Sequence, residues 1–255
     1  FGTDPSDISV SFNGTPAEFE LVDESTIVAT TPADYQTGSV TVTIHGYTMT
    51  GGAMFNPNSK GDVTVLYLQN YKQPFAKAND ESWKNGEWWT PAVWNQNAAS
   101  FNAKGNTTVS GMQYKSEEGL TLAFQNGWDK EAYTNGKMWQ VATLRPGKYR
   151  LEVTYAYTLV VTDAGNFISV LIAKGDSESD IPNVADLEQL NGVCAIYDKA
   201  GTNDDSGVLV TPSFEVTETT DVVIGFLTSL AKGNSYFKAV SYTHLRAHES
   251  KANLV

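Results

Sequence analysis

The tryptophans are the residues with the clearest chemical meaning, because all six lie between positions 83 and 139. Four of them, Trp83, Trp88, Trp89 and Trp94, fall within residues 83–94. This segment is rich in Asn, Gln and Gly, holds a proline and does not keep the alternation of a strand, so we expect a loop. Loops carry function more often than the sheets that they connect.

Indoles on a loop suit the binding of sugars. A pyranose has an apolar face of C–H bonds and an edge of hydroxyls; a Trp ring offers a large flat surface, and Asn or Asp supplies paired hydrogen bonds. Trp128 follows the end of an expected strand, which allows a loop position next to the first cluster. The expected ligand-binding site therefore consists of Trp83, Trp88, Trp89, Trp94, Trp128, Asn126 and Asp129.

The same segment has a structural alternative. A long loop needs a small core of its own, and the indoles of residues 83–94 could form it without any ligand. Exposed, coplanar rings at Trp88 and Trp89 would favour sugar binding, whereas buried rings would favour the structural alternative. Trp139 lies in an expected strand beside a Pro-Gly turn, so we assign it to the core.

The overall composition narrows the function classes. The 255 residues carry a net charge of -12, which argues against nucleic acid and anionic membranes as partners. Hydrophobic residues make up 41% and charged residues 18%, so the chain is not a disordered acidic tail. One cysteine allows neither a disulfide framework nor a thiolate zinc site. No apolar run is long enough to insert into a membrane, and no signal segment is visible in a chain that begins with Phe1.

Residues that could catalyse a reaction are sparse. His45 ends an expected strand and is expected to be a capped or surface residue. Cys194 has apolar neighbours and is expected to be an inert, buried thiol. Serine-hydrolase, zinc-protease and phosphate-loop motifs do not occur in the sequence. We therefore expect no enzyme and no catalytic residues, although the acidic residues could include the carboxylate pair of a glycosidase.

The last residues have an unusual sequence. Residues 240–249 (VSYTHLRAHE) resemble one reading frame of a sequencing adapter, and Ser250 departs from the usual threonine. We interpret residues 241–255 as a non-native tail; a genuine polar C-terminal tail is the alternative. On this interpretation two of the three histidines leave functional consideration.

Strand alternation and turn signals run through nearly the whole chain and predict an all-β fold. Asn13-Gly14 predicts a type I′ hairpin, and residues 55–62 are polar, turn-rich and the best linker candidate. Asn183 and Gly192 bracket one expected helix over residues 184–190. The strands expected after the linker are 63–68, 107–114, 120–125, 138–144, 149–158, 167–173, 208–216, 222–227 and 236–240.

Two regions resemble known families. Residues 1–56 resemble a truncated IPT/TIG immunoglobulin-like spacer, through Phe1-Gly2-Thr3, VSFNG at 10–14 and TIVATTP at 26–32. Residues 62–240 resemble galactose-binding-like jelly rolls, through WQVATLRPGKYRLEV at 139–153 and DVVIGF at 221–226. More narrowly, this second region resembles a domain family of uncharacterised function from Bacteroidota surface proteins, found after IPT/TIG modules in outer-membrane lipoproteins tied to polysaccharide use.

These resemblances imply a partial immunoglobulin-like sandwich followed by a jelly-roll sandwich that binds polysaccharide or oligosaccharide at the cell surface, without catalysis. Jelly rolls of this kind often hold a structural calcium. Residues 176–180 and 203–207 offer oxygen donors, but neither has the spacing of an EF-hand loop, so we expect no cofactor, with calcium as the alternative. Two other functions remain open: a structural or adhesive module with a protein partner, and an accessory domain of a glycoside hydrolase.

Overall fold

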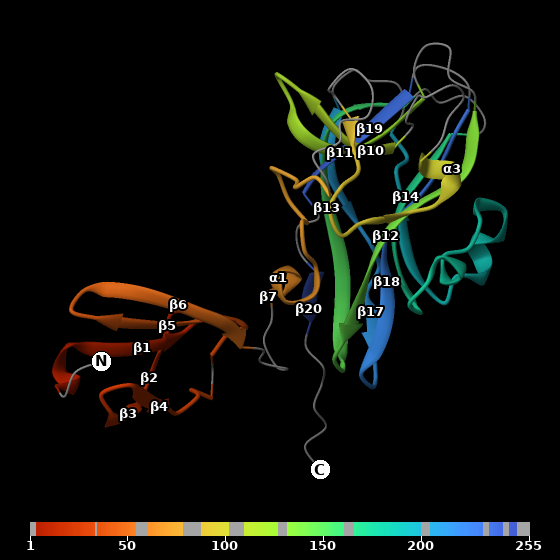
Figure 1. Ribbon diagram of the computed structural model, residues 1–255. Coiled ribbons are helices and arrows are strands. Elements are labelled where there is room, and N and C mark those ends of the chain that lie inside the picture. Colours follow the sequence, from red (N-terminus) through yellow and green to blue (C-terminus); the bar gives the residue numbers. More distant parts are fainter. Residues whose placement is uncertain are drawn as a thin grey trace.

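The computed structural model describes residues 4–33, 35–54, 61–78, 88–101, 110–126, 132–160, 166–199, 205–231, 235–241 and 245–248. These residues form almost entirely β-structure, as the sequence predicts. Figure 1 shows a smaller body made by the N-terminal strands and a larger body made by the rest of the chain.

The smaller body is an immunoglobulin-like sandwich of short strands. Asn13 and Gly14 have φ angles of 46° and 85°, which confirms the predicted type I′ turn between the first two strands. Val10, Phe12 and Tyr35 are buried at its centre. One sheet has the order β2 (Thr15–Ala17), β1 (Ile8–Phe12), β5 (Gly38–Ile44) and β6 (Tyr47–Met54); the other pairs β3 (Phe19–Asp23) with β4 (Thr26–Ala29), and a short 3-10 turn, η1 (Pro5–Asp7), precedes β1.

The larger body is a sandwich of two antiparallel sheets. Its first sheet has the order β7 (Gly61–Asp62), β20 (Leu245–His248), β13 (Gly147–Leu159), β19 (Ser235–Ser241), β11 (Gly119–Asn126), β10 (Ser110–Lys115) and β8 (Trp88–Trp89), and β16 (Asp205–Val210) and β17 (Phe214–Val216) also pair with β13. Its second sheet has the order β15 (Gly192–Ile196), β14 (Phe167–Lys174), β18 (Thr220–Leu230), β12 (Tyr133–Leu144) and β9 (Asn95–Gln96). Two single helical turns, α1 (Thr64–Tyr67) and α3 (Ala98–Phe101), accompany the sheets.

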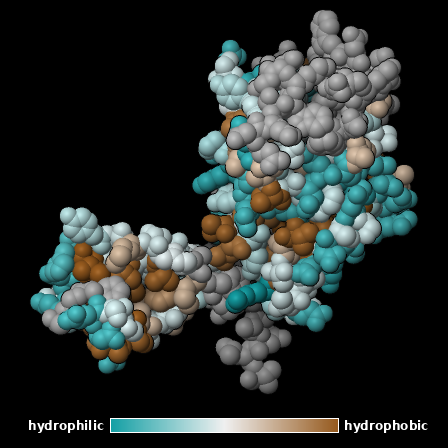
Figure 2. All heavy atoms as spheres, viewed as in Figure 1, coloured by the Kyte–Doolittle hydropathy of each residue, from teal (hydrophilic) through white to brown (hydrophobic). Residues whose placement is uncertain are grey.

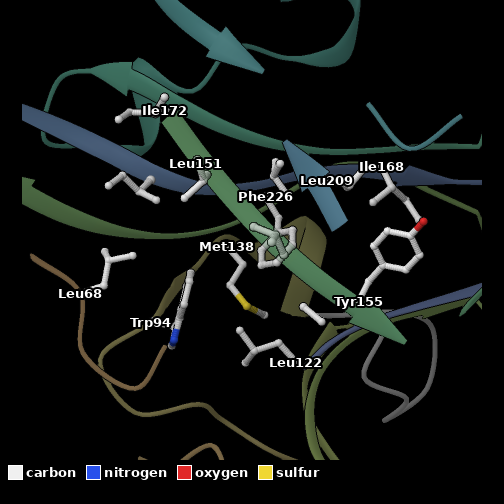
Figure 3. Packing of buried hydrophobic residues seen from close by; sticks show 14 of the residues in the cluster. Leu68, Trp94, Leu122, Met138, Leu151, Tyr155, Ile168, Ile172, Leu209 and Phe226 are labelled. Carbon is white, nitrogen blue, oxygen red and sulfur yellow. The ribbon is translucent and has the colours of Figure 1, made fainter. Parts of the chain in front are cut away.

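The main hydrophobic core lies between these two sheets. Met138 of β12 is paired with Phe226 of β18, and both side chains are fully buried. The Phe226 ring lies 4.6 Å from the ring of Phe124 in the opposite sheet. Figure 3 shows Leu122 and Trp94 beside Met138, so the same core is continuous across the sandwich.

A second, smaller core covers the outer face of the five-stranded sheet. Trp139, Val223 and Leu227 point out of the sandwich and are nevertheless buried. The segment between β14 and β15, drawn in teal at the right of Figure 1, lies over them and contributes the buried Ile181. This segment contains the 3-10 turns η2 (Glu178–Asp180) and η3 (Val184–Gln189), with Asn183 at the N-cap position of η3.

The structure corrects several predicted elements. Residues 63–68 form the α1 turn and not a strand, because the Asp62 carboxylate accepts hydrogen bonds from the Thr64 amide (2.9 Å) and hydroxyl (2.6 Å). The strand predicted over 208–216 breaks into β16 and β17 around Pro212, which cannot donate to a ladder. Strand β15 was not predicted, and the predicted helix over 184–190 is the 3-10 turn η3. Residues 55–60 of the predicted linker lie outside the described residues.

The predicted non-native tail takes part in a sheet. Leu245 is paired with Leu151 of β13, and Arg246 is paired with Asp62 of β7. This pairing shows how residues 245–248 fold. It does not test whether the tail is native, so its non-native origin stays a prediction. In the described part of the chain, no helix is long and apolar enough to cross a membrane.

Candidate functional site

Two of the tryptophans predicted to bind ligand are core residues. Trp88 and Trp94 are 7% and 5% exposed. The Trp94 indole nitrogen donates to the carbonyl oxygen of Asn70 (2.9 Å), and its ring lies 6.2 Å from that of Phe226. The predicted loop thus contains β8 and is followed directly by β9, and the pairing of these two strands with β10 and β12 turns the indoles into the body. A sugar cannot stack on a buried ring, so the burial of Trp88 and Trp94 favours the structural alternative for both.

Trp89 is half-buried at the edge of the core. It is paired with Met112 of β10, and the Lys77 ammonium lies 5.5 Å from the centre of its ring. Its indole nitrogen is buried and meets no hydrogen-bond partner in the described ranges. Trp89 thus lies at the edge of the core with a buried indole nitrogen that no described residue satisfies. Trp139 is a core residue, and its predicted burial is confirmed at 8% exposure.

Asn126 is fully buried at the end of β11. Its amide nitrogen donates to the carbonyl oxygen of Leu230 (3.3 Å), and its amide oxygen has no partner in the part of the chain that the structure describes. Trp83, Trp128 and Asp129, predicted to form a site with it, lie outside the described residues.

Sequence reasoning missed a polar hollow on the outer face of the five-stranded sheet. The hollow has a volume of about 420 Å³. Lys137 of β12 contributes from the sheet, and the segment that carries η2 and η3 contributes the rest. The polar side chains that line it include Lys137, Asp180, Asn183, Asp186, Gln189 and Asn191.

Lys137 ties the sheet to this segment. Its side chain is buried at 6% exposure, and its ammonium donates to the carbonyl oxygens of Ile181 (2.5 Å) and Glu178 (3.4 Å). Burial lowers the pKa of Lys137, and the negative charge of Glu178 opposes that shift. The sequence signal for this contact was Lys137 between apolar residues of a mostly buried strand, since a buried ammonium requires acceptors.

A second set of hydrogen bonds fixes the segment at Glu178 and at Val184. The Asn97 amide donates to the carbonyl oxygen of Asn135 (2.8 Å) and to the Glu178 carboxylate (3.1 Å), and its oxygen accepts from the Lys137 amide (3.0 Å). The Asn135 side chain accepts from the amide of Val184 (2.8 Å). The walls of the hollow are therefore held in place by the sheet, which lowers the entropic cost of binding a ligand.

Asp180 closes a tight turn at one side of the hollow. One of its carboxylate oxygens accepts from the hydroxyl of Ser177 (2.7 Å), the Ser177 amide (3.0 Å) and the Asp176 amide (3.0 Å). The bond from the Ser177 hydroxyl is the largest cause of a lowered pKa at Asp180; burial opposes it, and the two backbone bonds add to the lowering. This carboxylate is therefore ionised and committed to its own turn.

The fit to calcium is poor in the described part of the chain. The Asp180 oxygen predicted as a donor already accepts three hydrogen bonds, and within the described ranges no three His, Cys, Asp or Glu side chains come together to hold a metal ion. Asn203 and Asp204, in the other predicted donor segment, lie outside those ranges.

Three side chains of the hollow are unengaged. Asn183, Asp186 and Gln189 are exposed, and their side chains form no hydrogen bond with another described residue. They offer two amides and one carboxylate, which can pair with vicinal hydroxyls. Cys194 lies half-buried in the smaller core, where burial raises the pKa of its thiol and so disfavours the thiolate. His45 lies in the smaller body, 3.0 Å from Asp7 and exposed.

A second hollow, of about 400 Å³, lies between α1 and β12. Tyr67 and Val141 line it, and Figure 2 shows hydrophobic surface over this part of the larger body. Thr143, one of its polar groups, already donates to Asp221 (2.6 Å). This hollow therefore offers fewer free hydrogen-bonding groups than the polar hollow beside η3.

Comparison with known families matches both bodies. The model of the IPT/TIG domain matches residues 1–59, as the resemblance of the first body implies. The model of a domain of unknown function, DUF5013, matches residues 69–225. No curated protein sequence matches the chain.

Several solved structures are similar in fold. A carbohydrate-binding module, TmCBM61, solved with β-1,4-galactotriose, is 11% identical with a TM-score of 0.39, covering 70% of this chain and 99% of that one. Carbohydrate-binding modules of the β-sandwich superfamily are 10% identical to this chain with a TM-score of 0.34. The match covers 95% of this chain and 84% of that one. SGBP-B from a complex xyloglucan utilization locus in Bacteroides uniformis is 11% identical with a TM-score of 0.28. The match covers 93% of this chain and 65% of that one. At this level of similarity, what those proteins bind does not say what this chain binds.

Proposed function

Because the chain belongs to the DUF5013 family, which is described only as a domain of unknown function, we propose a function from the geometry itself: the larger body binds carbohydrate through the polar hollow, without catalysis. The observation that carries this proposal is the set of unengaged side chains, Asn183, Asp186 and Gln189, around a hollow of about 420 Å³. Amides donate and accept, and carboxylates accept, which is the pattern that sugar hydroxyls pair with.

The rigidity of the hollow supports binding. Lys137 and Asn97 anchor the segment to the sheet through the contacts given above. A wall that is already ordered loses little conformational freedom when a ligand arrives. Binding without catalysis is supported by Asp180, whose carboxylate is committed to its own turn and so is not free to pair with Asp186 as a glycosidase would require.

The aromatic contact predicted from the sequence stays in the proposal in reduced form. Trp89, Trp83 and Trp128 remain predicted stacking residues, and Asp129 remains their predicted polar partner, whereas the burial of Asn126 disfavours contact with a ligand. Location at the cell surface, with the IPT/TIG module as a spacer, also remains a proposal. The net charge of -12 supports a partner other than nucleic acid.

The test is isothermal titration of the full chain against a panel of polysaccharides. Asp186→Ala and Gln189→Ala should each weaken binding about tenfold, since a lost hydrogen bond to a ligand costs roughly 1–3 kcal/mol. Glu188→Ala is the matched control, because Glu188 is exposed on the same turn and does not line the hollow.

Three results would reject the site. Binding that is unchanged in both variants rejects the hollow, and binding lost only in Trp89→Ala moves the site to the tryptophans. Binding to a protein partner with no glycan bound would favour an adhesive module instead.

A further inference from the structure

We infer that the hollow selects neutral and amino sugars and rejects uronic and sulfated sugars, with Asp186 as the specificity-determining residue. This inference rests on the proposed function, because it names the class of sugar that the same hollow accepts. It follows from which charges line the hollow and which of them are already satisfied.

Three ionisable groups line the hollow: Lys137, Asp180 and Asp186. Two negative charges therefore face one positive charge. Glu178 adds a further carboxylate next to the hollow, 3.1 Å from the Asn97 amide. A ligand that enters meets an environment with an excess of negative charge.

Asp186 is the carboxylate that a ligand must contact. It is exposed, and its side chain bonds to no other described residue. An ionised carboxylate accepts hydrogen bonds and donates none, so it pairs with a hydroxyl or an ammonium group. A carboxylate or sulfate of the sugar in that place would put two like charges together, which is a repulsive element against the wrong ligand.

Lys137 does not reverse this preference. It is 6% exposed, and two of its donors are directed at the carbonyl oxygens of Ile181 and Glu178. An ammonium has three donors, so one remains for a ligand. A uronate that paired with it would have to reach a largely buried ammonium in a hollow that the carboxylate of Asp186 also lines.

The charge of the whole chain acts in the same direction over a longer range. A net charge of -12 repels polyanionic glycans before they reach the hollow. Salt screens this long-range part beyond roughly 10 Å at 0.1 M, and screens a contact inside the hollow much less. High salt therefore removes the long-range repulsion, and a substitution at Asp186 removes the contact inside the hollow, so the two contributions can be measured separately.

The experiment compares matched neutral and acidic glycans: mannan with polymannuronate, and unsubstituted xylan with glucuronoxylan. The wild-type chain should bind the neutral member of a pair at least about tenfold more tightly, the effect of one unfavourable charge contact. This ratio should persist at about 0.5 M NaCl, where long-range repulsion is screened.

Asp186→Asn keeps the shape and removes the charge, so it should reduce the ratio severalfold by strengthening binding of the acidic glycan. Glu188→Gln makes the same change of net charge outside the hollow and should leave the ratio unchanged at that salt concentration. Circular dichroism shows that each variant is folded, and Asp186→Ser replaces Asp186→Asn if it is not.

The outcomes separate the inference from the proposed function. If the wild-type chain binds acidic glycans as tightly as their neutral partners, or if Asp186→Asn leaves the ratio unchanged, the inference is overturned while carbohydrate binding stands. If no member of any pair binds and no other polysaccharide does, the proposed function itself fails.

Discussion

The ammonium of Lys137 lies 2.5 Å from the carbonyl oxygen of Ile181, so the strand that forms the floor of the polar hollow also holds its wall. Ile181 is itself buried against Trp139 in the smaller core. One polar and one apolar contact therefore fix the same point of the segment. This double attachment explains why a stretch with only two 3-10 turns keeps a defined shape over the sheet.

Lys137→Met should loosen this segment without unfolding the sandwich. The substitution keeps the length of the side chain and leaves the carbonyl oxygen of Ile181 without its donor, at a local cost of roughly 1–3 kcal/mol. Amides of residues 177–191 should exchange hydrogen about tenfold faster or more. Lys174→Met, at an exposed position at the end of β14, is the control and should leave this exchange unchanged. If the amides of residues 177–191 are equally protected from exchange in both variants, the hydrogen bond from Lys137 to Ile181 does not hold the segment in place.

Trp94→Ala should lower the free energy of unfolding by about 3–5 kcal/mol, because it empties a large volume from the main core. The buried position and the bond to Asn70 predict this loss, measured by denaturant unfolding. Val93→Ala, at a neighbouring residue that is 52% exposed, should cost far less. Glycan binding measured below the unfolding transition should be the same in both variants; a loss confined to Trp94→Ala would restore this indole as a ligand contact.

Acid should open the turn at Asp180 before the sandwich unfolds. The hydroxyl and amides that lower its pKa stabilise the ionised carboxylate, and the folded pKa therefore lies below that of the unfolded chain. Such a group contributes stability above the unfolded pKa, near 3.9, which is lost as the pH falls through the folded value.

Amide exchange at Asp176 and Ser177 should accordingly rise below about pH 4. Asp180→Asn should show fast exchange at these amides at neutral pH and little further change with acid. Protection in the wild-type chain that stays constant through this range would contradict the assignment.

Alkali should reveal tyrosines that ionise only when the sandwich unfolds. Burial raises the pKa of Tyr133, whose hydroxyl donates to Thr228 (3.1 Å). Burial, followed by contact with Tyr67, likewise raises the pKa of Tyr149. Their stabilising contribution is complete below the unfolded pKa near 10 and is lost as the pH rises above it.

Phenolate absorbance should therefore rise in two phases, the second coinciding with loss of β-structure by circular dichroism. Tyr133→Phe should reduce the amplitude of the second phase. A single phase, complete while the chain is still folded, would show that these rings are open to solvent.

Alternation and turn chemistry were sufficient to predict the class of fold. The Asn13-Gly14 turn follows from local rules, and the structure confirms it. The strands of the larger body were found within a few residues where both faces are apolar, as in β14 and β18.

The site could not be predicted in the same way, because it depends on contacts between distant segments. The composition of residues 83–94 favours a loop, but pairing of Trp88 with Gln113 and of Asn95 with Trp139 turns this segment into sheet edges. Similarly, no local pattern shows that residues 177–191 will fold back over β12. The polar hollow exists only because that segment and Lys137 meet.

The most direct test of carbohydrate binding at the hollow is a ¹H–¹⁵N correlation spectrum recorded while a neutral oligosaccharide is added. Side-chain amides and indoles give separate signals, so the two candidate surfaces are read in one experiment. We predict that the side-chain amide signals of Asn183, Gln189 and Asn191 shift as the oligosaccharide is added. In the Asp186→Ala variant, the same signals should shift only at a higher concentration of oligosaccharide. Shifts confined to the indole signals, with the amides of the hollow unchanged, would contradict the central claim.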